Sequence, residues 1–246
     1  MSQLGGKAAL VTGGSRGIGA AIARRLAREG ADVALTYLSA ADRAKTVVAE
    51  IEAEGGRGLA LGADGAHPGA VVAAVERTVA ELGRLDILVN NAGVFPNGPL
   101  EDVSLEEVDQ TLAVHVRAVF VASQAAARHM GAGGRIISIG SCFAERVPYP
   151  GVSLYAMSKS ALIGLTKGLA RDLGERAITA NVIHPGSTDT EMNPAGGESA
   201  EEERGFIALG HYASTEDIAA TVAHLAGEGG RYITGASIAV DGGFAA

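Results

Sequence analysis

The sequence predicts an α/β fold of the Rossmann type, a doubly wound, parallel, seven-stranded sheet with helices on both faces. Short apolar runs alternate with longer segments of helical periodicity along the whole chain, and such alternation produces parallel strands joined by right-handed crossovers. The runs are continuously apolar, which is typical of strands buried on both faces. Hydrophobic residues make up 47% of the chain but aromatic residues only 4%, so Ala, Val, Leu and Ile must fill the core.

Seven runs are expected to be strands, at 7–12, 32–37, 58–61, 87–90, 135–139, 179–183 and 237–240. Six segments are expected to be helices, at 17–29, 41–54, 68–82, 104–129, 155–174 and 214–225. Local signals mark some ends, since Gly30 suits a C-cap and Ser104 with Glu107 three residues later forms a capping pattern. Neither an internal repeat nor a low-complexity linker divides residues 1–246, which predicts a single dinucleotide-binding catalytic domain.

Residues 188–210 interrupt the alternation, because they mix Pro194, Gly196 and Gly197 with a cluster of acidic side chains. Long irregular segments in compact domains are usually mobile lids or binding loops. We therefore expect a substrate loop here, with a solvated surface excursion as the alternative.

Composition excludes several classes of protein. The net charge of −8 argues against a general binder of nucleic acid or of an anionic membrane. The single cysteine, Cys142, rules out an intrachain disulfide and fits a reducing compartment. No secretory signal and no apolar run of about 18 residues is visible, and the histidines show no metal-ligand spacing. These features predict a soluble cytoplasmic enzyme without a metal.

A glycine-rich turn separates the first expected strand from the first expected helix. It reads Thr12-Gly-Gly-Ser-Arg-Gly-Ile-Gly19, and glycines at this place let the backbone approach a pyrophosphate that sits on the positive helix N-terminus. The candidate cofactor-binding residues are Gly13, Ser15, Arg16, Gly17, Ile18 and Gly19. A plain tight turn is the alternative.

Tyr155 and Lys159 are four residues apart in an expected helix, so their side chains share a face. A nearby cation favours the ionised form of a phenol and is expected to lower its pKa. A phenol tuned in this way can act as a general acid or base for the interconversion of a carbonyl and an alcohol. Ser141, fourteen residues before the tyrosine, is a candidate hydrogen-bond donor to the same oxygen.

Taken together, these motifs resemble the short-chain dehydrogenase/reductase family over essentially the whole chain. The matching elements occur in order and are Gly13-x-x-x-Gly17-x-Gly19, Asp64, Asn90-Asn91-Ala92-Gly93, Ser141, Tyr155-x-x-x-Lys159, Pro185-Gly186 with Thr190, and the ending Thr234-Gly-Ala…Asp241-Gly-Gly-Phe244.

The resemblance implies roles for these residues. Tyr155 would donate the proton, Ser141 would hydrogen-bond the substrate oxygen, and Lys159 would bind the nicotinamide ribose and hold Tyr155 at a low pKa. Further cofactor contacts are implied at Asp64, Asn91, Ala92, Gly93, Pro185, Gly186, Thr188 and Thr190.

Three further residues lie near these motifs. His115 stands where the family usually has asparagine, and it is either a member of the proton relay or a packed helix histidine. His184 precedes Pro185 and is a candidate lining residue. Cys142 is expected to be a small buried hydrophobe rather than a nucleophile.

The second strand predicts the cofactor. Sites that prefer NAD place an acid at the end of this strand to bind the ribose 2′-hydroxyl, but here the strand ends in Thr36-Tyr-Leu-Ser39. Arg16 can pair with a 2′-phosphate, and Thr36 or Ser39 can hydrogen-bond it. NADPH is therefore expected rather than NADH.

The expected substrate is a small-molecule carbonyl compound, either a small or aromatic ketone or a 3-oxoacyl thioester. Overall similarity is to 3-oxoacyl-carrier-protein reductases and to carbonyl reductases. Arg176 falls at one basic position that would suit an acidic carrier protein, whereas the stretch before Arg135 lacks the other. The run Pro148-Tyr149-Pro150 predicts an apolar wall suited to a ketone.

Two alternatives come from other classes. Gly13-x-Ser15-x-Gly17 matches the nucleophile elbow of a serine hydrolase, and a non-catalytic NADP(H)-binding protein would share the glycine-rich turn. For the assembly, the resemblance implies a homotetramer. The apolar C-terminus and the excess apolar surface expected from Leu162, Ile163 and Leu165 suit its interfaces.

Overall fold

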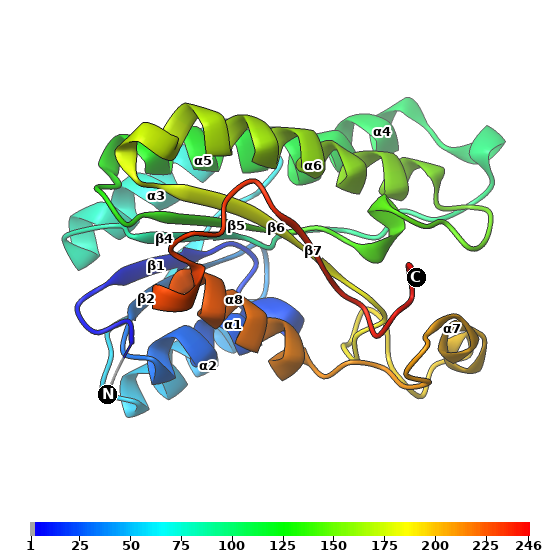
Figure 1. Ribbon diagram of the computed structural model, residues 1–246, viewed down its shortest axis with the longest axis horizontal. Helices are drawn as coiled ribbons and strands as arrows, with labels where there is room; N and C mark the ends of the chain where they lie inside the picture. The colour runs from blue at the N-terminus through cyan, green and yellow to red at the C-terminus, as the bar shows by residue number, and fades with distance from the viewer. Residues whose placement is uncertain (1–2) are drawn as a thin grey trace.

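The computed structural model describes residues 3–246 and confirms the predicted fold. Figure 1 shows one twisted sheet between two layers of helices. All seven strands are parallel, in the order β3-β2-β1-β4-β5-β6-β7. The strands are β1 Ala8–Val11, β2 Asp32–Tyr37, β3 Gly58–Gly62, β4 Ile87–Asn90, β5 Arg135–Ile139, β6 Thr179–Pro185 and β7 Ser237–Val240.

The helices divide between the two faces of the sheet (Figure 1). One face carries α1 Gly17–Arg28, α2 Ala41–Ala53 and α8 Thr215–Ala226. The other face carries α3 Pro68–Leu82, α4 Leu105–Leu112, α5 Ala118–His129 and α6 Ser153–Leu173. Short 3₁₀ turns occur at Leu100–Asp102, Cys142–Ala144, Gly174–Arg176 and Glu228–Gly230. No helix within residues 3–246 is long and apolar enough to span a membrane.

The strand order creates the position of the site. After β3 the chain crosses to the other side of β1, so β2 and β4 flank β1. The turn after β1 and the segment after β4 therefore meet at the carboxyl end of the sheet, the topological switch point at which such folds bind ligands. β1, β4 and β5 are buried along their whole length, and their inward side chains join two aliphatic cores, one under each helical layer.

The structure differs from the predicted elements in two places. The expected helix at 104–129 is divided into α4 and α5 by a π-helical turn, Ala113–Arg117, and such turns are frequent at functional sites. The expected loop 188–210 contains a short helix, α7 Ala200–Phe206. Figure 1 shows α7 apart from the two helical layers, at the same end of the molecule as the C-terminus.

Candidate active site

A cavity of about 810 Å³ opens at the carboxyl end of the sheet and reaches from the glycine-rich turn to α7. Nearly all of the predicted site residues line it: Gly13, Ser15, Arg16, Gly17, Ile18, Gly19, Thr36, Asp64, Asn91, Ala92, Gly93, Ser141, Tyr155, Lys159, Pro185, Gly186, Thr188 and Thr190. Two predicted residues, Ser39 and His115, do not. Ser39 is exposed, and His115 lies behind the cavity wall.

The glycines of the first turn leave the space that a dinucleotide needs. Gly13 and Gly17 have φ of +67° and +53°, values that side chains disfavour. A Cβ on Gly19 would lie 2.4 Å from both the Gly13 carbonyl oxygen and the Asn91 amide nitrogen. The turn is therefore a cradle that a methyl group would fill, and it fits the pyrophosphate of a nucleotide cofactor.

The segment after β4 is tied to this turn. The Thr12 hydroxyl accepts hydrogen bonds from the backbone N–H groups of Asn91 (2.9 Å) and Ala92 (3.0 Å). The Asn91 side-chain amide donates to the carbonyls of Thr12 (2.9 Å) and Gly13 (3.1 Å). These bonds hold two chain segments, which are far apart in sequence, as one rigid floor of the cavity.

Ser141, Tyr155 and Lys159 meet on one wall. The Ser141 hydroxyl, which accepts a hydrogen bond from the Phe143 N–H at 3.2 Å, lies close enough to the Tyr155 phenol to lower its pKa. The Lys159 ammonium lies 5.7 Å from the centroid of the Tyr155 ring and donates to the Ile139 carbonyl at 3.0 Å. Because α6 supplies both the phenol and the ammonium and β5 ends beside them, the sheet and the helix together position the three groups.

The expected lowering of the Tyr155 pKa is wrong for the protein's own groups. Burial raises the pKa of Tyr155 to about 12, and the hydrogen bond from Ser141 opposes this only in part. Burial also lowers the pKa of Lys159 to about 8. Desolvation is the largest influence on both groups, and with a pKa of about 12 Tyr155 is protonated at neutral pH.

His115 is a packed, neutral histidine. Its Nε2 accepts a hydrogen bond from the Val94 N–H at 2.9 Å, and its Nδ1 lies 2.8 Å from the Ser158 hydroxyl, which itself donates to the Tyr155 carbonyl. These partners define the tautomer with hydrogen on Nδ1. Burial, followed by the charge of Lys159, lowers the His115 pKa to about 3. The ring therefore positions the start of α6 and the irregular segment after Gly93, in agreement with the packed alternative.

His184 and Cys142 lie behind Ser141. His184 is fully buried, with Nδ1 within 3.1 Å of the Ser141 backbone nitrogen and Nε2 2.8 Å from the Ser237 hydroxyl. It supports the serine rather than lining the cavity. Burial raises the pKa of Cys142 to about 12, so the thiol stays protonated and packs as a small hydrophobic side chain. Among the described residues, no His, Cys, Asp or Glu side chains are grouped to hold a metal.

An ion cluster lies at the end of the cavity beside β2. Glu191 accepts hydrogen bonds from Arg43 at 2.5 and 2.6 Å and lies 3.8 Å from the Arg16 guanidinium. Thr36 is buried and its hydroxyl accepts a hydrogen bond from the Gly13 N–H at 3.0 Å. Two guanidinium groups therefore converge on one carboxylate, an arrangement that suits a phosphate equally well. Arg43 and Glu191 were missed in the sequence because neither belongs to a motif.

Aromatic side chains form the other end of the cavity. Phe95 and Phe143 pack edge-on against Tyr155, with ring centroids 4.8 and 6.0 Å away. Tyr149 packs against Phe143 at 5.4 Å, which places the predicted apolar wall on the same side of the cavity as Tyr155. The sequence contains only five phenylalanines, and four of them gather here: Phe95, Phe143, Phe206 and Phe244.

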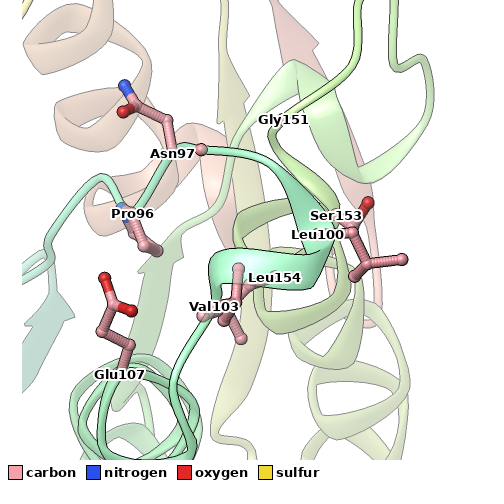
Figure 2. A pocket seen from close by; sticks show the side chains of 9 residues that line it. Pro96, Asn97, Leu100, Val103, Glu107, Gly151, Ser153 and Leu154 are labelled. Atoms are coloured by element: carbon pink, nitrogen blue, oxygen red, sulfur yellow. The ribbon is translucent and has the colours of Figure 1, made fainter.

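A second cavity, of about 10 Å³, lies between the first 3₁₀ turn and the start of α6 (Figure 2). Its wall includes Asn97, Leu100 and Leu154, and the backbone bond from Gly98 to Gly151 closes one side at 2.9 Å. This volume holds one water molecule at most, so the cavity is no substrate site.

Arg176 is engaged in the fold. Its guanidinium donates to the carbonyls of Ala127 at 2.5 Å and Met130 at 2.8 Å, at the end of α5. The side chain thus caps a helix rather than presenting a free charge to a carrier protein.

Comparison with known proteins agrees with this geometry. A family profile described as "Enoyl-(Acyl carrier protein) reductase" matches residues 13–245. The chain is 42% identical, over the full length of both proteins, to the "Cyclic-di-GMP-binding biofilm dispersal mediator protein" of Escherichia coli K12. A short-chain dehydrogenase from Burkholderia cenocepacia J2315, solved in complex with NADP, is 60% identical with a TM-score of 0.98 over 99% of this chain and 100% of that one.

A blue fluorescent protein from a metagenomic library, solved in complex with NADPH, is 58% identical with a TM-score of 0.98 over 99% of this chain and 100% of that one. These matches extend over the same residues as the glycine-rich cradle, the Asn91 segment and the Tyr155–Lys159 helix. The chain belongs to the short-chain dehydrogenase/reductase family of oxidoreductases.

Proposed function

We propose that the protein is an NADPH-dependent reductase that converts a small or aromatic ketone to a secondary alcohol. The observation that carries the proposal is that Ser141, Tyr155 and Lys159 line one cavity, with the nucleotide cradle on one side and an aromatic pocket on the other. A carbonyl oxygen placed between the two hydroxyls receives both hydrogen bonds while the ketone carbon faces the cofactor side.

The cofactor supplies the hydride when bound, and the residues of this chain manage the charge that then develops on oxygen. Tyr155 donates its proton to that oxygen, and Ser141 stabilises the developing charge by a hydrogen bond. A phenol with a pKa of about 12 holds its proton at neutral pH, so it is ready to act as the acid. The Lys159 ammonium, 5.7 Å from the centroid of the Tyr155 ring, favours the phenolate left behind. Oxidation of the alcohol needs that phenolate first, so it is favoured only at high pH.

Preference for NADPH follows from charge. Two arginines, Arg16 and Arg43, flank the end of the cavity where β2 ends, and β2 carries no acid there to bind a 2′-hydroxyl. The solved relatives that bind NADP or NADPH support the same preference.

The site favours a ketone over a carrier-bound 3-oxoacyl thioester. Carrier proteins are expected to need free basic side chains, but Arg176 is hydrogen-bonded within the fold and Arg135 is buried. Three acidic residues, Glu191, Glu198 and Glu203, line the cavity on the side of the 188–210 loop. A neutral ketone avoids the repulsion that an acidic partner would meet there.

We further propose a cytoplasmic homotetramer in which 188–210 serves as the substrate loop. The alternative is a protein that binds nucleotide without catalysis, and the E. coli relative, which is named for binding cyclic-di-GMP, gives that alternative weight. A serine hydrolase is disfavoured, because Ser15 lies in the nucleotide cradle and no histidine lines the cavity among residues 3–246.

A substrate panel tests the proposal. Aryl ketones, aliphatic ketones, a 3-oxoacyl thioester and a 2-enoyl thioester are offered with NADPH, and oxidation of the reduced nicotinamide is followed by absorbance. We expect turnover of ketones above that of either thioester. Tight binding of NADPH or cyclic-di-GMP with no turnover of any carbonyl compound would instead establish the binding-only alternative.

A further inference from the structure

Glu203 is an acidic side chain that faces the aromatic end of the substrate cavity. It lies on α7 three residues after Ala200, which is buried in the aromatic cluster. Positions three apart share one face of a helix, so Glu203 is on the same face as Ala200. It is half-buried and lines the cavity together with Phe143 and Tyr149.

One oxygen of the Glu203 carboxylate accepts several hydrogen bonds from the protein, and the other accepts none in the described part of the chain. Oε2 accepts hydrogen bonds from the Ser187 hydroxyl at 2.6 Å, the Asn193 amide at 2.8 Å and the Tyr212 hydroxyl at 2.9 Å. Within residues 3–246, Oε1 receives no hydrogen bond from the protein. Three donors therefore hold the carboxylate in one orientation and leave one acceptor for a molecule in the cavity.

The negative charge of Glu203 acts on titratable side chains in the wall of the substrate pocket. It contributes, after burial, to the raised pKa values of the Tyr149 phenol and the Cys142 thiol. No arginine or lysine is hydrogen-bonded or ion-paired to Glu203 in the described part of the chain, so the negative charge is not neutralised by a direct partner. A substrate group that ends beside Oε1 meets a fixed acceptor of negative charge.

We propose that Glu203 determines substrate specificity, with its free oxygen accepting a hydrogen bond from a hydroxyl carried by the ketone. The inference rests on the proposed reductase function and narrows its substrate to hydroxylated aryl ketones, the aryl ring packing among Phe95, Phe143 and Tyr149. Ketones that carry a carboxylate at that end are rejected by like charge.

Three ketones with the same aryl core test this, one carrying a hydroxyl, one a methoxy group and one a carboxylate. The wild-type protein should show kcat/KM for the hydroxyl compound about tenfold or more above the methoxy compound, because a hydrogen bond to a charged group is lost. The carboxylate compound should be the poorest of the three.

Glu203→Gln gives the sharpest contrast. The glutamine oxygen takes the place of Oε2 among its three donors, so the amide NH₂ faces the cavity and replaces an acceptor by a donor. The preference for hydroxyl over methoxy should then disappear, and the carboxylate compound should gain about tenfold or more. An unchanged order of the three substrates in Glu203→Gln overturns the proposal.

Two further variants separate specificity from folding. Glu202→Gln removes the same charge from an exposed position of α7 and should leave the substrate order unchanged. Tyr212→Phe removes one of the three donors but keeps the acceptor, so its order should also match the wild type. If Tyr212→Phe changes the order as much as Glu203→Gln does, loop position rather than the free oxygen sets specificity, and the proposal fails.

The controls also distinguish this inference from the reductase function. NADPH titration and thermal melting of each variant report an intact fold and cofactor site. A wild-type protein that reduces none of the three ketones and no other carbonyl compound contradicts the proposed function itself. Ketone reduction without discrimination between hydroxyl and methoxy contradicts only the role of Glu203. A ketone carrying an ammonium group that outperforms the hydroxyl compound, with its advantage lost in Glu203→Gln, supports the acceptor role and identifies the donor as cationic.

Discussion

At the scale of single residues, the proposed catalytic wall combines two side chains, Tyr155 and Lys159, whose charged forms are both disfavoured by burial. Tyr155 keeps its proton to a pKa of about 12, and Lys159 loses its proton at about 8. Tyr155 is thus protonated at neutral pH and can donate a proton, and Lys159 lies beside the phenolate that forms. This arrangement suits reduction better than oxidation.

Replacement of Tyr155 by phenylalanine removes the proton donor and little else. We expect turnover of a ketone to fall about 10²–10⁴-fold, the usual contribution of general acid catalysis, while NADPH binds as before. Stopped-flow or steady-state reduction together with a cofactor titration measures both. Tyr232→Phe is the matched control, because Tyr232 is 98% exposed. A loss below tenfold would exclude Tyr155 as the main donor.

Arg16 is expected to recognise the 2′-phosphate. Arg16→Ala should weaken NADPH binding by about one to two decades, the loss of one hydrogen bond to a charged group, and should leave NADH binding nearly unchanged. Arg24→Ala is the control, because Arg24 lies on α1, the helix that Arg16 precedes, but pairs with Glu50 at 2.6 Å. Equal losses for the two cofactors would show that Arg16 does not contact the phosphate.

At the scale of elements, the C-terminal segment packs behind the aromatic end of the cavity. Phe244 is fully buried and packs against Phe143 and Phe206, with ring centroids 5.6 and 5.9 Å away. Arg146 also donates to the Phe244 carbonyl at 2.5 Å. The sequence predicted that this segment serves an interface between subunits, but within one chain it already supports the substrate pocket and α7.

Phe244→Ala should therefore destabilise the fold and loosen the pocket together. Buried Phe→Ala changes cost about 3–5 kcal/mol of unfolding free energy, and the KM for an aryl ketone should rise because the aromatic wall loses its support. Denaturant unfolding and steady-state kinetics measure the two effects. Tyr232→Ala, at an exposed site, should change stability by less than about 0.5 kcal/mol. A stable Phe244→Ala protein with normal KM would mean that the segment is dispensable.

At the scale of the whole molecule, burying Lys159 makes stability depend on pH. Its pKa is lowered from 10.5 to about 8, so the unfolded chain binds the proton more tightly than the folded one. The resulting penalty is present below about pH 8 and fades as pH rises toward 10.5. Lys159→Met removes a penalty of up to about 3 kcal/mol.

Denaturant unfolding of Lys159→Met and wild type at about pH 7 and about pH 10 tests this linkage. The variant should be the more stable protein at the lower pH, and its advantage should shrink at the higher pH. Lys45→Met, at an exposed position of α2, is the control and should show no such trend. An advantage that is the same at both pH values would contradict the buried, weakly basic lysine.

The proposed tetramer needs apolar surface. Of the three residues expected to supply it, Ile163 and Leu165 are half-buried and only Leu162 is removed from the surface. Leu162 is buried inside the subunit, at 2% exposure. Phe120 on α5 and Met157 on α6 are instead 51% and 50% exposed, on one helical layer of the molecule (Figure 1). Large apolar side chains exposed on neighbouring helices suit burial against a second copy.

Phe120→Glu and Met157→Glu should each shift the sedimentation of the protein toward smaller species, because a charge would be buried in the interface. Ala53→Glu introduces the same charge at an exposed position of α2, on the opposite face of the sheet, and should leave the assembly intact. An intact wild-type chain that sediments as an active monomer would contradict the proposal.

The sequence by itself determined the order of strands and helices and the two local chemical patterns. The expected strand 32–37 matches β2, and 87–90 matches β4, because apolar runs and helical periodicity express burial directly along the chain. The glycine cradle and the Tyr155–Lys159 pair were equally predictable, since each depends only on close neighbours in one turn or one helix.

Tertiary structure alone decided the contacts between distant segments. Four such contacts join residues that no local sequence pattern connects. They are the hydrogen bond of His115 to Val94, the packing of Phe244 on Phe143, the capping of α5 by Arg176, and the pairing of Glu191 with Arg43. The pKa of Tyr155 belongs with them, because desolvation depends on how many segments pack around the phenol. Sequence spacing reports that Lys159 is near, but only the packed fold shows that burial has the larger effect.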